Sequence, residues 1–259
     1  MKDQALLNES IVIGTRRRVE VSLRNALAIV VAYMWQTVNG GPVSASNAYK
    51  FAAHSYDFVL RGYPNRIVAG LYASTGLNSD LGAVEMLRVL AAVNEGLIPE
   101  LSDDLAFWEM DVEKLVTDPN DDSPEGKLWS FFKAFMGDKV DGVKTGGING
   151  VGAAGYSKTA HHGWPRQMPL FDSIVLRAWS SNGAWREMHE TLTSNSEWFA
   201  ELERLIEVYR IEYQSGDGFE TFRLRHLDVL AWINGSGQWD SALAAGEALL
   251  DACGDISAW

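Results

Sequence analysis

The sequence predicts a mainly α-helical fold, and three observations support this prediction. From Asn25 onward, apolar residues recur at the three- and four-residue spacing of helices that bury one face, and Gly, Pro, Asn or Ser bound the segments. No period of 20–50 residues repeats, which excludes solenoids and propellers. The longest apolar run, residues 26–35, is about half of the roughly 20 residues that span a bilayer. We therefore expect a soluble helical protein of 259 residues, long enough for one large domain or two small ones.

The chain begins with two short runs rich in β-branched residues. Residues 11–13 (IVI) and 18–22 (RVEVS) flank Gly14 and Thr15. This pattern predicts a short N-terminal β-hairpin.

The helical segments follow in order. Ser102, which two acids follow, fits the N-cap of one of them. Another begins at Ser196 and carries an apolar stripe as far as Tyr209. The other segments that we expect to be helical are residues 25–38, 46–60, 81–95, 103–116, 127–136, 222–233 and 241–252.

Residues 117–126 interrupt this series. They contain two prolines and four acids and no apolar residue, so we expect an exposed loop there. We place a boundary between two lobes at this loop.

Residues 141–172 form a glycine-rich segment that does not fit the helical pattern. Gly150-Val151-Gly152, followed by residues 153–161, has the layout of a helix-hairpin-helix over about residues 138–162: a short helix, a tight turn and a second helix. The glycines let main-chain amides approach a phosphate, and the N-terminus of the second helix adds its partial positive charge. Main-chain donors carry no formal charge, so such an element can bind a DNA backbone without a basic composition.

The same glycines allow an alternative interpretation. Gly150, Gly152 and Gly155 satisfy the dinucleotide-binding spacing G-x-G-x-x-G, and Asp172 follows 22 residues after the first of them. That motif needs a buried strand directly before it, and residues 144–149 are too short and too polar for one. A dinucleotide-dependent oxidoreductase is therefore the less favoured alternative.

The charge distribution separates acidic from basic segments. The formal net charge is -12, which argues at first against a nucleic-acid binder. Counted by segment, however, residues 1–60 and 141–180 each carry +2, whereas residues 61–140 carry -7 and residues 181–259 carry -9. Arg16-Arg17-Arg18 is the only basic cluster outside the glycine-rich segment. The acidity therefore limits the extent of a DNA contact and does not exclude one.

Both the N-terminus and the cysteine content favour a cytoplasmic protein. The first residues, Met1-Lys2-Asp3-Gln4, lack the basic stretch, apolar run and cleavage site of a secretion signal. The one cysteine, Cys253, can form no internal disulfide and excludes an all-thiolate zinc or iron-sulfur site within one chain.

Several motifs together resemble a known family. They are Gly150-Val151-Gly152, Ser157-Lys158, Trp164-Pro165-Arg166, the run Pro169-Leu170-Phe171-Asp172-Ser173, and the segment from Arg225 to Trp232 (RHLDVLAW). These motifs resemble the helix-hairpin-helix DNA glycosylase superfamily, and most closely the bacterial proteins described as 8-oxoguanine glycosylase-like. The resemblance covers roughly 40 residues and implies a two-lobed helical glycosylase-like fold. Some members of this wider group occur in phage-defence loci.

The resemblance implies that Asp172 is the catalytic carboxylate, which stabilises the oxocarbenium character of the sugar when the N-glycosidic bond breaks. Asp172 also fits the N-cap of a helix over residues 173–179. Bifunctional members carry a lysine two residues after the second hairpin glycine, where this chain has Ala154. Lys158 lies one turn later on the same helix face, so it either forms a Schiff base or contacts a phosphate.

Further site residues follow from the same segment. His161 and His162 are adjacent and support no metal site, so we expect phosphate contact or capping, and we expect neither a metal nor a cofactor. Trp164 and Phe171 are expected to approach the DNA, and Asp228 and Trp232 to line the base pocket. We expect the DNA backbone to be bound by Gly147, Gly150, Val151, Gly152, Lys144, His161 and Arg166.

These expectations define a function and an alternative. The first is a DNA glycosylase that excises a modified base from double-stranded DNA and leaves an abasic site, with selectivity for modified phage DNA. It needs no membrane and no obligate protein partner. The alternative is a non-catalytic helix-hairpin-helix module that binds DNA. Neither the base nor an accompanying lyase activity can be read from the sequence.

Overall fold

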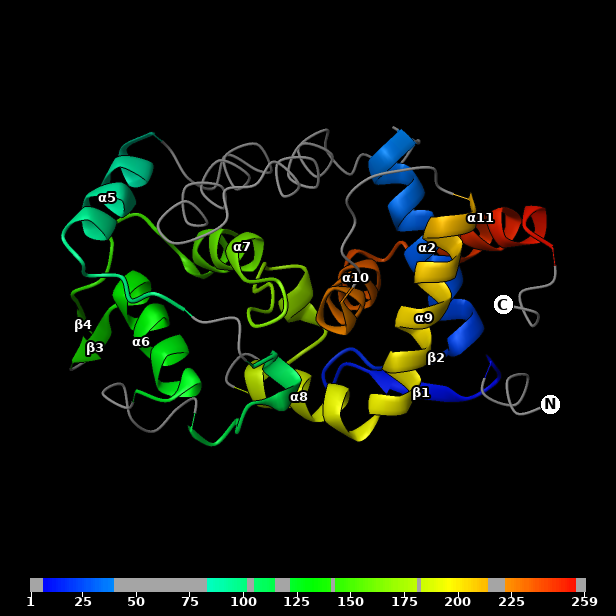
Figure 1. Cartoon of the computed structure of the whole chain (residues 1–259), viewed down its shortest axis with the longest axis horizontal. Coiled ribbons are helices and arrows are strands. Elements are labelled where there is room, and N and C mark those ends of the chain that lie inside the picture. Colours follow the sequence, from blue (N-terminus) through cyan, green and yellow to red (C-terminus); the bar gives the residue numbers. More distant parts are fainter. Residues whose placement is uncertain are drawn as a thin grey trace. The chain divides into compact units, whose positions relative to one another are not determined.

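The structure is mainly helical and divides into two compact units (Figure 1). This computed structural model describes residues 7–39, 83–101, 105–114, 122–140, 143–180, 183–213 and 222–254. Unit 1 comprises residues 1–47 and 173–259, and unit 2 comprises residues 48–172. Within the described ranges, no helix combines the length and the apolarity that crossing a membrane requires.

Unit 1 begins with the predicted β-hairpin, which the structure confirms. Strands β1 (Ser10–Ile13) and β2 (Val19–Ser22) pair antiparallel, with Ile11 opposite Val21. These two side chains are buried, because alternate residues of a strand point to the same face. Gly14, which follows β1, has φ 83°, and a Cβ there would come within 2.8 Å of the Ala178 carbonyl oxygen.

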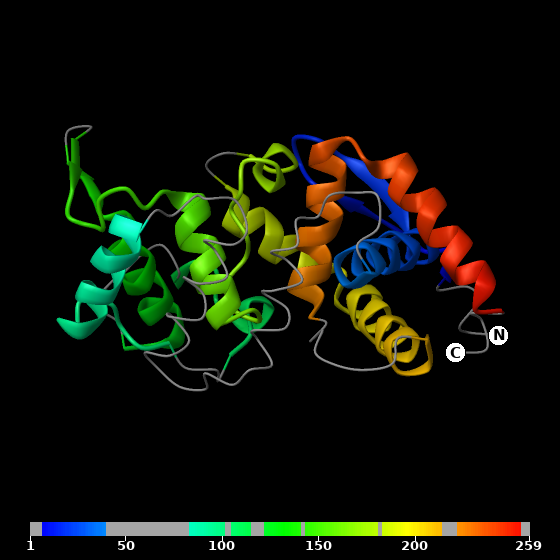
Figure 2. The same cartoon turned by 90° about the horizontal axis from the view of Figure 1, so that it is seen from above.

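Helix α2 (Leu23–Asn39) forms the centre of unit 1. Residues 26–34 expose at most 5% of their surface, because other helices cover α2 on several sides. The closest approach is at Gly246, where a Cβ would lie only 1.9 Å from the Ala28 carbonyl oxygen. Figure 2 shows α2 beside its three main partners, α9 (Ser196–Tyr213), α10 (Arg223–Ser236) and α11 (Trp239–Ala252).

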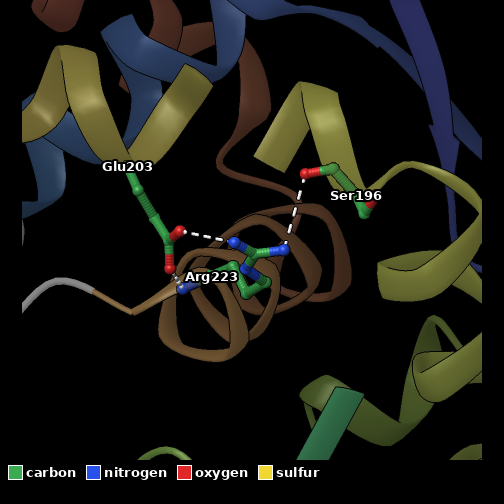
Figure 3. A network of polar contacts seen from close by, with 3 residues as sticks. All are labelled: Ser196, Glu203 and Arg223. Atoms are coloured by element: carbon green, nitrogen blue, oxygen red, sulfur yellow. Dashed lines mark hydrogen bonds and ion pairs between the residues drawn. The ribbon is translucent and has the colours of Figure 1, made fainter. Parts of the chain in front are cut away.

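A carboxylate joins α9 to the start of α10 (Figure 3). The backbone amide of Arg223 donates to Glu203 Oε1 at 2.5 Å, and the Arg223 guanidinium donates to Glu203 Oε2 at 3.0 Å. The guanidinium also donates to the Ser196 carbonyl at 3.5 Å. The positive end of α10 is therefore occupied by an acid from within the protein.

Two further helical elements are described in unit 1, α8 (Ala184–Ser194) and the 3₁₀ helix η3 (Val175–Arg177). The predicted α-helix over residues 173–179 is wrong, because only this single turn forms there. The N-cap of η3 is Ile174, so Asp172 does not occupy that position.

Unit 2 is built around an aromatic core between α6 (Pro124–Met136) and α7 (Ala153–Gly163). The Phe131 ring lies 5.4 Å from Trp164 and 6.0 Å from Tyr156, and Phe135 lies 5.4 Å from Tyr156. All four side chains are at most 1% exposed. The other elements in the described part of unit 2 are α5 (Ala83–Asn94), η1 (Phe107–Glu109), β3 (Asp138–Val140) and β4 (Val143–Thr145).

The structure confirms most of the predicted helices that fall on described residues. The helices expected over residues 25–38, 81–95, 127–136, 222–233 and 241–252 are present, and so is the one starting at Ser196. The helix expected over residues 46–60, the Ser102 cap and much of the 117–126 loop lie outside the described residues.

Three predictions about unit 2 are wrong. The described part of residues 103–116 forms no α-helix, because tertiary bonds hold it: the Phe107 amide donates to the Arg166 carbonyl, and Gln167 donates to the Leu105 carbonyl. Residues 138–140 and 143–145 form the antiparallel pair β3–β4 where a short helix was expected. The chain divides after residues 47 and 172, so the 117–126 loop lies inside unit 2 and is not the boundary.

Candidate functional site

The glycine turn, which we define as residues 146–152, connects β4 to α7. Gly146, Gly147 and Gly150 have φ between 69° and 88°, the left-handed region that favours glycine. The turn is fixed to the end of α6 by the Ile148 amide, which donates to the Phe135 carbonyl at 2.9 Å. Ile148 and Val151 are buried and anchor the turn in unit 2. The buried Val151 side chain leaves only the backbone of that residue for a ligand.

The glycines of this turn differ in whether the surrounding packing requires the absence of a Cβ. A Cβ at Gly147 would lie 2.5 Å from the Gly137 nitrogen, and a Cβ at Gly150 would lie 2.7 Å from Glu85 Cγ. Packing therefore explains both glycines. Gly152 is exposed and has φ -91°, and a Cβ there would meet open space, with no atom within 4 Å. Packing does not require glycine at 152.

The start of α7 contributes no acid of its own. Its N-cap is Gly152, no side chain caps it, and its first turn contains no acid. By contrast, Ser123 caps α6, and Glu203 accepts a bond from the first amide of α10. A helix N-terminus without such a partner leaves amide donors and a partial positive charge available to an external anion.

Helix α5 lies against the glycine turn. Arg88 Nη1 donates to the Asn149 carbonyl at 2.9 Å and lies 3.7 Å from Glu85 Oε1. The Arg88 side chain remains 47% exposed. A cleft of about 510 Å³ lies between α5, the end of α6 and residues 147–149. Arg88 is not among the residues expected from the sequence, because nothing in the sequence links it to a turn 61 residues away.

A short segment before Asp172 runs back along α7. His161 Nδ1 donates to the Met168 carbonyl at 2.6 Å, and the Phe171 amide donates to Ser157 Oγ at 2.9 Å. Phe171, the later residue of the segment, thus pairs with Ser157, the earlier of the two helix residues. Segment and helix therefore run in opposite directions.

This arrangement brings Lys158 and Asp172 to the same part of unit 2. Lys158 directly follows Ser157 and Asp172 directly follows Phe171, and a hydrogen bond joins Ser157 to Phe171. Lys158 is 2% exposed and Asp172 is 9% exposed. An amine and a carboxylate in a largely desolvated place interact with a reacting group more strongly than they would in water. Ala154, the position where bifunctional members carry lysine, is partly exposed one turn earlier on α7.

Burial argues against three of the expected DNA contacts. Trp164 is 1% exposed, packs against Phe131 and donates from Nε1 to the Leu101 carbonyl, so it is a core residue. Phe171 is 6% exposed, which leaves little of its ring for stacking on a base. His161 is 5% exposed, and its bond to Met168 holds the segment against α7. Aromatic and histidine side chains that look available in a sequence are often buried.

The other expected contacts remain predictions. Arg166 is exposed, with its guanidinium 5.7 Å from the Trp108 ring centroid. Lys144 lies in β4, but its side chain is outside the described residues, as is that of His162.

The two residues expected in the base pocket lie on α10, in unit 1. Asp228 is 1% exposed. Trp232 is partly buried, and its ring packs edge to face against Tyr33 at 6.2 Å. The buried Arg225 on the same helix donates to the Tyr33 hydroxyl at 3.1 Å, so Tyr33 joins two residues of the motif that suggested the family resemblance.

The geometry argues against a dinucleotide site. The strand before the glycines, β4, has three residues and pairs antiparallel with β3. Both sheets in the described part of the chain are two-stranded and antiparallel, whereas a dinucleotide-binding fingerprint belongs to a parallel βαβ unit.

Comparison with known proteins identified one family. The model of a family of unknown function, DUF6308, matches residues 43–235, which are 193 of the 259 residues. The matched range includes all of unit 2 and continues into α10. No curated protein and no solved structure gave a significant match.

Proposed function

The chain belongs to the DUF6308 family of unknown function, and we propose that it is a DNA glycosylase of the helix-hairpin-helix type. It excises a modified base from double-stranded DNA and leaves an abasic site. The observation that carries the proposal is the bond between the Phe171 amide and Ser157 Oγ. This bond holds the neighbours of Lys158 and Asp172 together, and these are the two residues that the resemblance assigns to catalysis.

The glycine turn supports the DNA-binding part of the proposal. In the proposed complex, amides at Gly150, Gly152 and the start of α7 donate to a backbone phosphate, and the partial positive charge of α7 adds to the attraction. Arg88 supplies a formal charge beside the turn. Because most of these donors are uncharged, the protein can hold a phosphate despite its net charge of -12.

The proposed reaction breaks the bond between sugar C1′ and the base nitrogen. The bonding electron pair leaves with the base, and positive charge develops on the sugar. The Asp172 carboxylate stabilises that charge and accepts a proton from the water that adds to C1′. Lys158 either orients this carboxylate or attacks C1′ itself to form a Schiff base.

A selective substrate is consistent with the acidic surface. Few Lys and Arg side chains are available to neutralise phosphates, so binding to ordinary duplex is weak, and discrimination depends on the flipped base. We propose a modified base, of the kind found in phage DNA, as the substrate. Asp228 and Trp232 are the proposed pocket residues on α10.

The central test is base release by Asp172→Asn. Wild-type protein and variant are incubated with hypermodified phage DNA, and released bases are identified by mass spectrometry. We expect single-turnover release to fall by about 100-fold or more, as when one electrostatic contact to a transition state is lost, while DNA binding persists. Asp240→Asn, at an exposed site on α11, is the matched control and should retain activity.

The outcome separates the two functions considered. A non-catalytic DNA-binding module would bind the duplex and release no base even as wild type. Borohydride trapping then tests the role of Lys158: a covalent DNA adduct that forms with wild-type protein and not with Lys158→Gln assigns the attack on C1′ to its amine.

A second test concerns Gly152. Packing leaves room for a Cβ there, so Gly152→Ala should unfold at the wild-type temperature. The same Cβ would stand where we propose that a phosphate approaches the amides, so duplex affinity should fall about fivefold, equivalent to one hydrogen bond of about 1 kcal/mol. Unchanged affinity would show that the glycine turn does not contact the DNA. Gly150→Ala is the contrasting control, because φ 88° and the contact with Glu85 predict a loss of stability.

A further inference from the structure

The connection between β1 and β2 is held rigidly in unit 1. The amides of Thr15, Arg16 and Arg17 donate to the Ala178 carbonyl at 2.9, 3.0 and 3.3 Å. On the other side of the turn, Asn234 Nδ2 donates to the Arg17 carbonyl at 2.7 Å. Figure 2 shows this turn beside the C-terminal end of α10. Its backbone is therefore ordered before any ligand binds.

Four arginines gather at this place, although they come from distant parts of the sequence. Arg17 Nη1 and Arg177 Nη1 both donate to the Gly235 carbonyl, each at 3.3 Å, so one acceptor near the end of α10 holds two guanidinium groups. Arg16 and Arg18 lie on either side of Arg17, and all four residues are exposed. We name Arg16, Arg17, Arg18 and Arg177 the arginine turn.

These four cations differ from five other arginines of the described structure, which form ion pairs. In the described part of the chain, no carboxylate forms an ion pair with any of the four. The exposed or half-buried arginines Arg24, Arg88, Arg204, Arg210 and Arg223 each have an acidic partner. A protein with a net charge of -12 thus neutralises these arginines and leaves the arginine turn unpaired.

The nearest acids do not neutralise the turn. Glu187 accepts from Thr15 Oγ1 at 2.5 Å and from the Ser180 hydroxyl and amide, so its carboxylate is bound by uncharged donors. Glu20, exposed on β2, forms no ion pair with the arginines of the turn in the described part of the chain. The turn therefore keeps its positive charge.

We propose that the arginine turn is a second DNA-binding surface, which contacts backbone phosphates of the duplex independently of the glycine turn. The planar guanidinium fork matches phosphate oxygens, and an ordered backbone lowers the entropy cost of presenting several forks together. Amphipathic segments that bind membranes also insert aromatic or aliphatic side chains between the lipids, and residues 15–18 contain none. The inference rests on the proposed function for its choice of duplex DNA as partner.

The test is the salt dependence of duplex binding. Anisotropy titrations with an unmodified 20-base-pair duplex compare wild type with Arg16→Gln/Arg18→Gln. These two exposed side chains make no bond within the described structure, so the variant should fold normally. Each lost phosphate contact makes the slope of log affinity against log salt shallower by about 0.9, so the double variant should lose about 1.8. The matched control, Arg24→Gln/Arg204→Gln, removes two ion-paired arginines from the same unit and should keep the wild-type slope.

Different results would overturn the inference. It fails if the slope of the double variant equals that of wild type, or if the control loses as much. It also fails if the variant loses binding only to phosphatidylserine vesicles, since the turn would then bind a membrane. A base-release assay on the same proteins separates this result from the proposed function. If the wild-type protein releases a base but the double variant keeps the wild-type slope, only the proposal for the arginine turn is rejected. If the slope changes but the wild-type protein releases no base, only the proposed glycosylase function is rejected.

Discussion

His226 is a buried histidine that the proposed mechanism does not use. It is 1% exposed on α10, and neither ring nitrogen has a hydrogen-bond partner in the described structure. Burial, followed by the charges of Arg225 and Arg223, lowers the pKa of His226 to about 3. The folded state therefore holds the neutral ring.

This histidine predicts a loss of stability in mild acid. Below pH 6.5 the unfolded chain takes up a proton that the folded state excludes until about pH 3, so stability present above pH 6.5 is lost as the pH falls. Between pH 6.5, where half of the unfolded chains already carry this proton, and pH 5 the loss should be about 1.6 kcal/mol, because full uptake of one proton corresponds to about 1.4 kcal/mol per pH unit. Urea unfolding across this range measures it.

The variant His226→Leu isolates this contribution. Leucine has a similar size and no polar atoms to leave unsatisfied, so stability at pH 7 should be equal or higher. The decline between pH 6.5 and pH 5 should become shallower. An equally steep decline in the variant would assign the acid sensitivity to other groups.

At the scale of elements, the contact between α7 and the segment before Asp172 is the most informative. Ser157 is fully buried and accepts the Phe171 amide. Ser157→Ala leaves that buried amide without its acceptor, which should cost about 1–3 kcal/mol of stability. It should also slow base release if Asp172 depends on this bond for its position. Single-turnover assays below the unfolding transition measure the rate.

A control distinguishes positioning from general destabilisation. Thr191→Ala, on α8, removes a hydroxyl that bonds only to the Glu187 carbonyl within its own helix. It should leave base release unchanged. If Ser157→Ala also releases bases at the wild-type rate, the bond does not position the catalytic carboxylate.

The elements also show how far the sequence determines this fold. Helices with a continuous apolar stripe, such as α9, could be predicted, because their spacing is a local property. Residues 105–114 have helical spacing but take their structure from bonds to the 164–168 loop, which no local pattern reveals. Tertiary contacts thus override the local preference.

For the candidate site, too, the sequence predicts some features and not others. The glycine turn and the start of α7 follow from Gly150 and Gly152, because backbone geometry depends on few neighbouring residues. The burial of Trp164 and the contribution of Arg88 could not be predicted, because each depends on packing between segments about 60 residues apart. Sequence spacing located the backbone of the site but not the side chains around it.

At the scale of the whole molecule, the distribution of charge determines how DNA can be held. The proposed phosphate contacts are the glycine turn in unit 2 and the arginine turn in unit 1. Beside the arginine turn, the Glu187 carboxylate is already bound by the Thr15 hydroxyl and by Ser180. Contacts to few phosphates, in an acidic protein, imply weak binding to unmodified DNA.

Contacts to few phosphates predict the salt response of two matched duplexes, one unmodified and one carrying the substrate base. With about four phosphates neutralised, the affinity for unmodified duplex should fall about 150-fold between 50 and 200 mM salt. Contacts to the flipped base are not ionic, so the modified duplex should bind more tightly by a factor that stays constant with salt. Asp172→Asn keeps the substrate intact during the titrations. Two parallel lines of log affinity against log salt would support selection through the base, whereas lines that converge at high salt would mean that the preference arises from phosphate contacts.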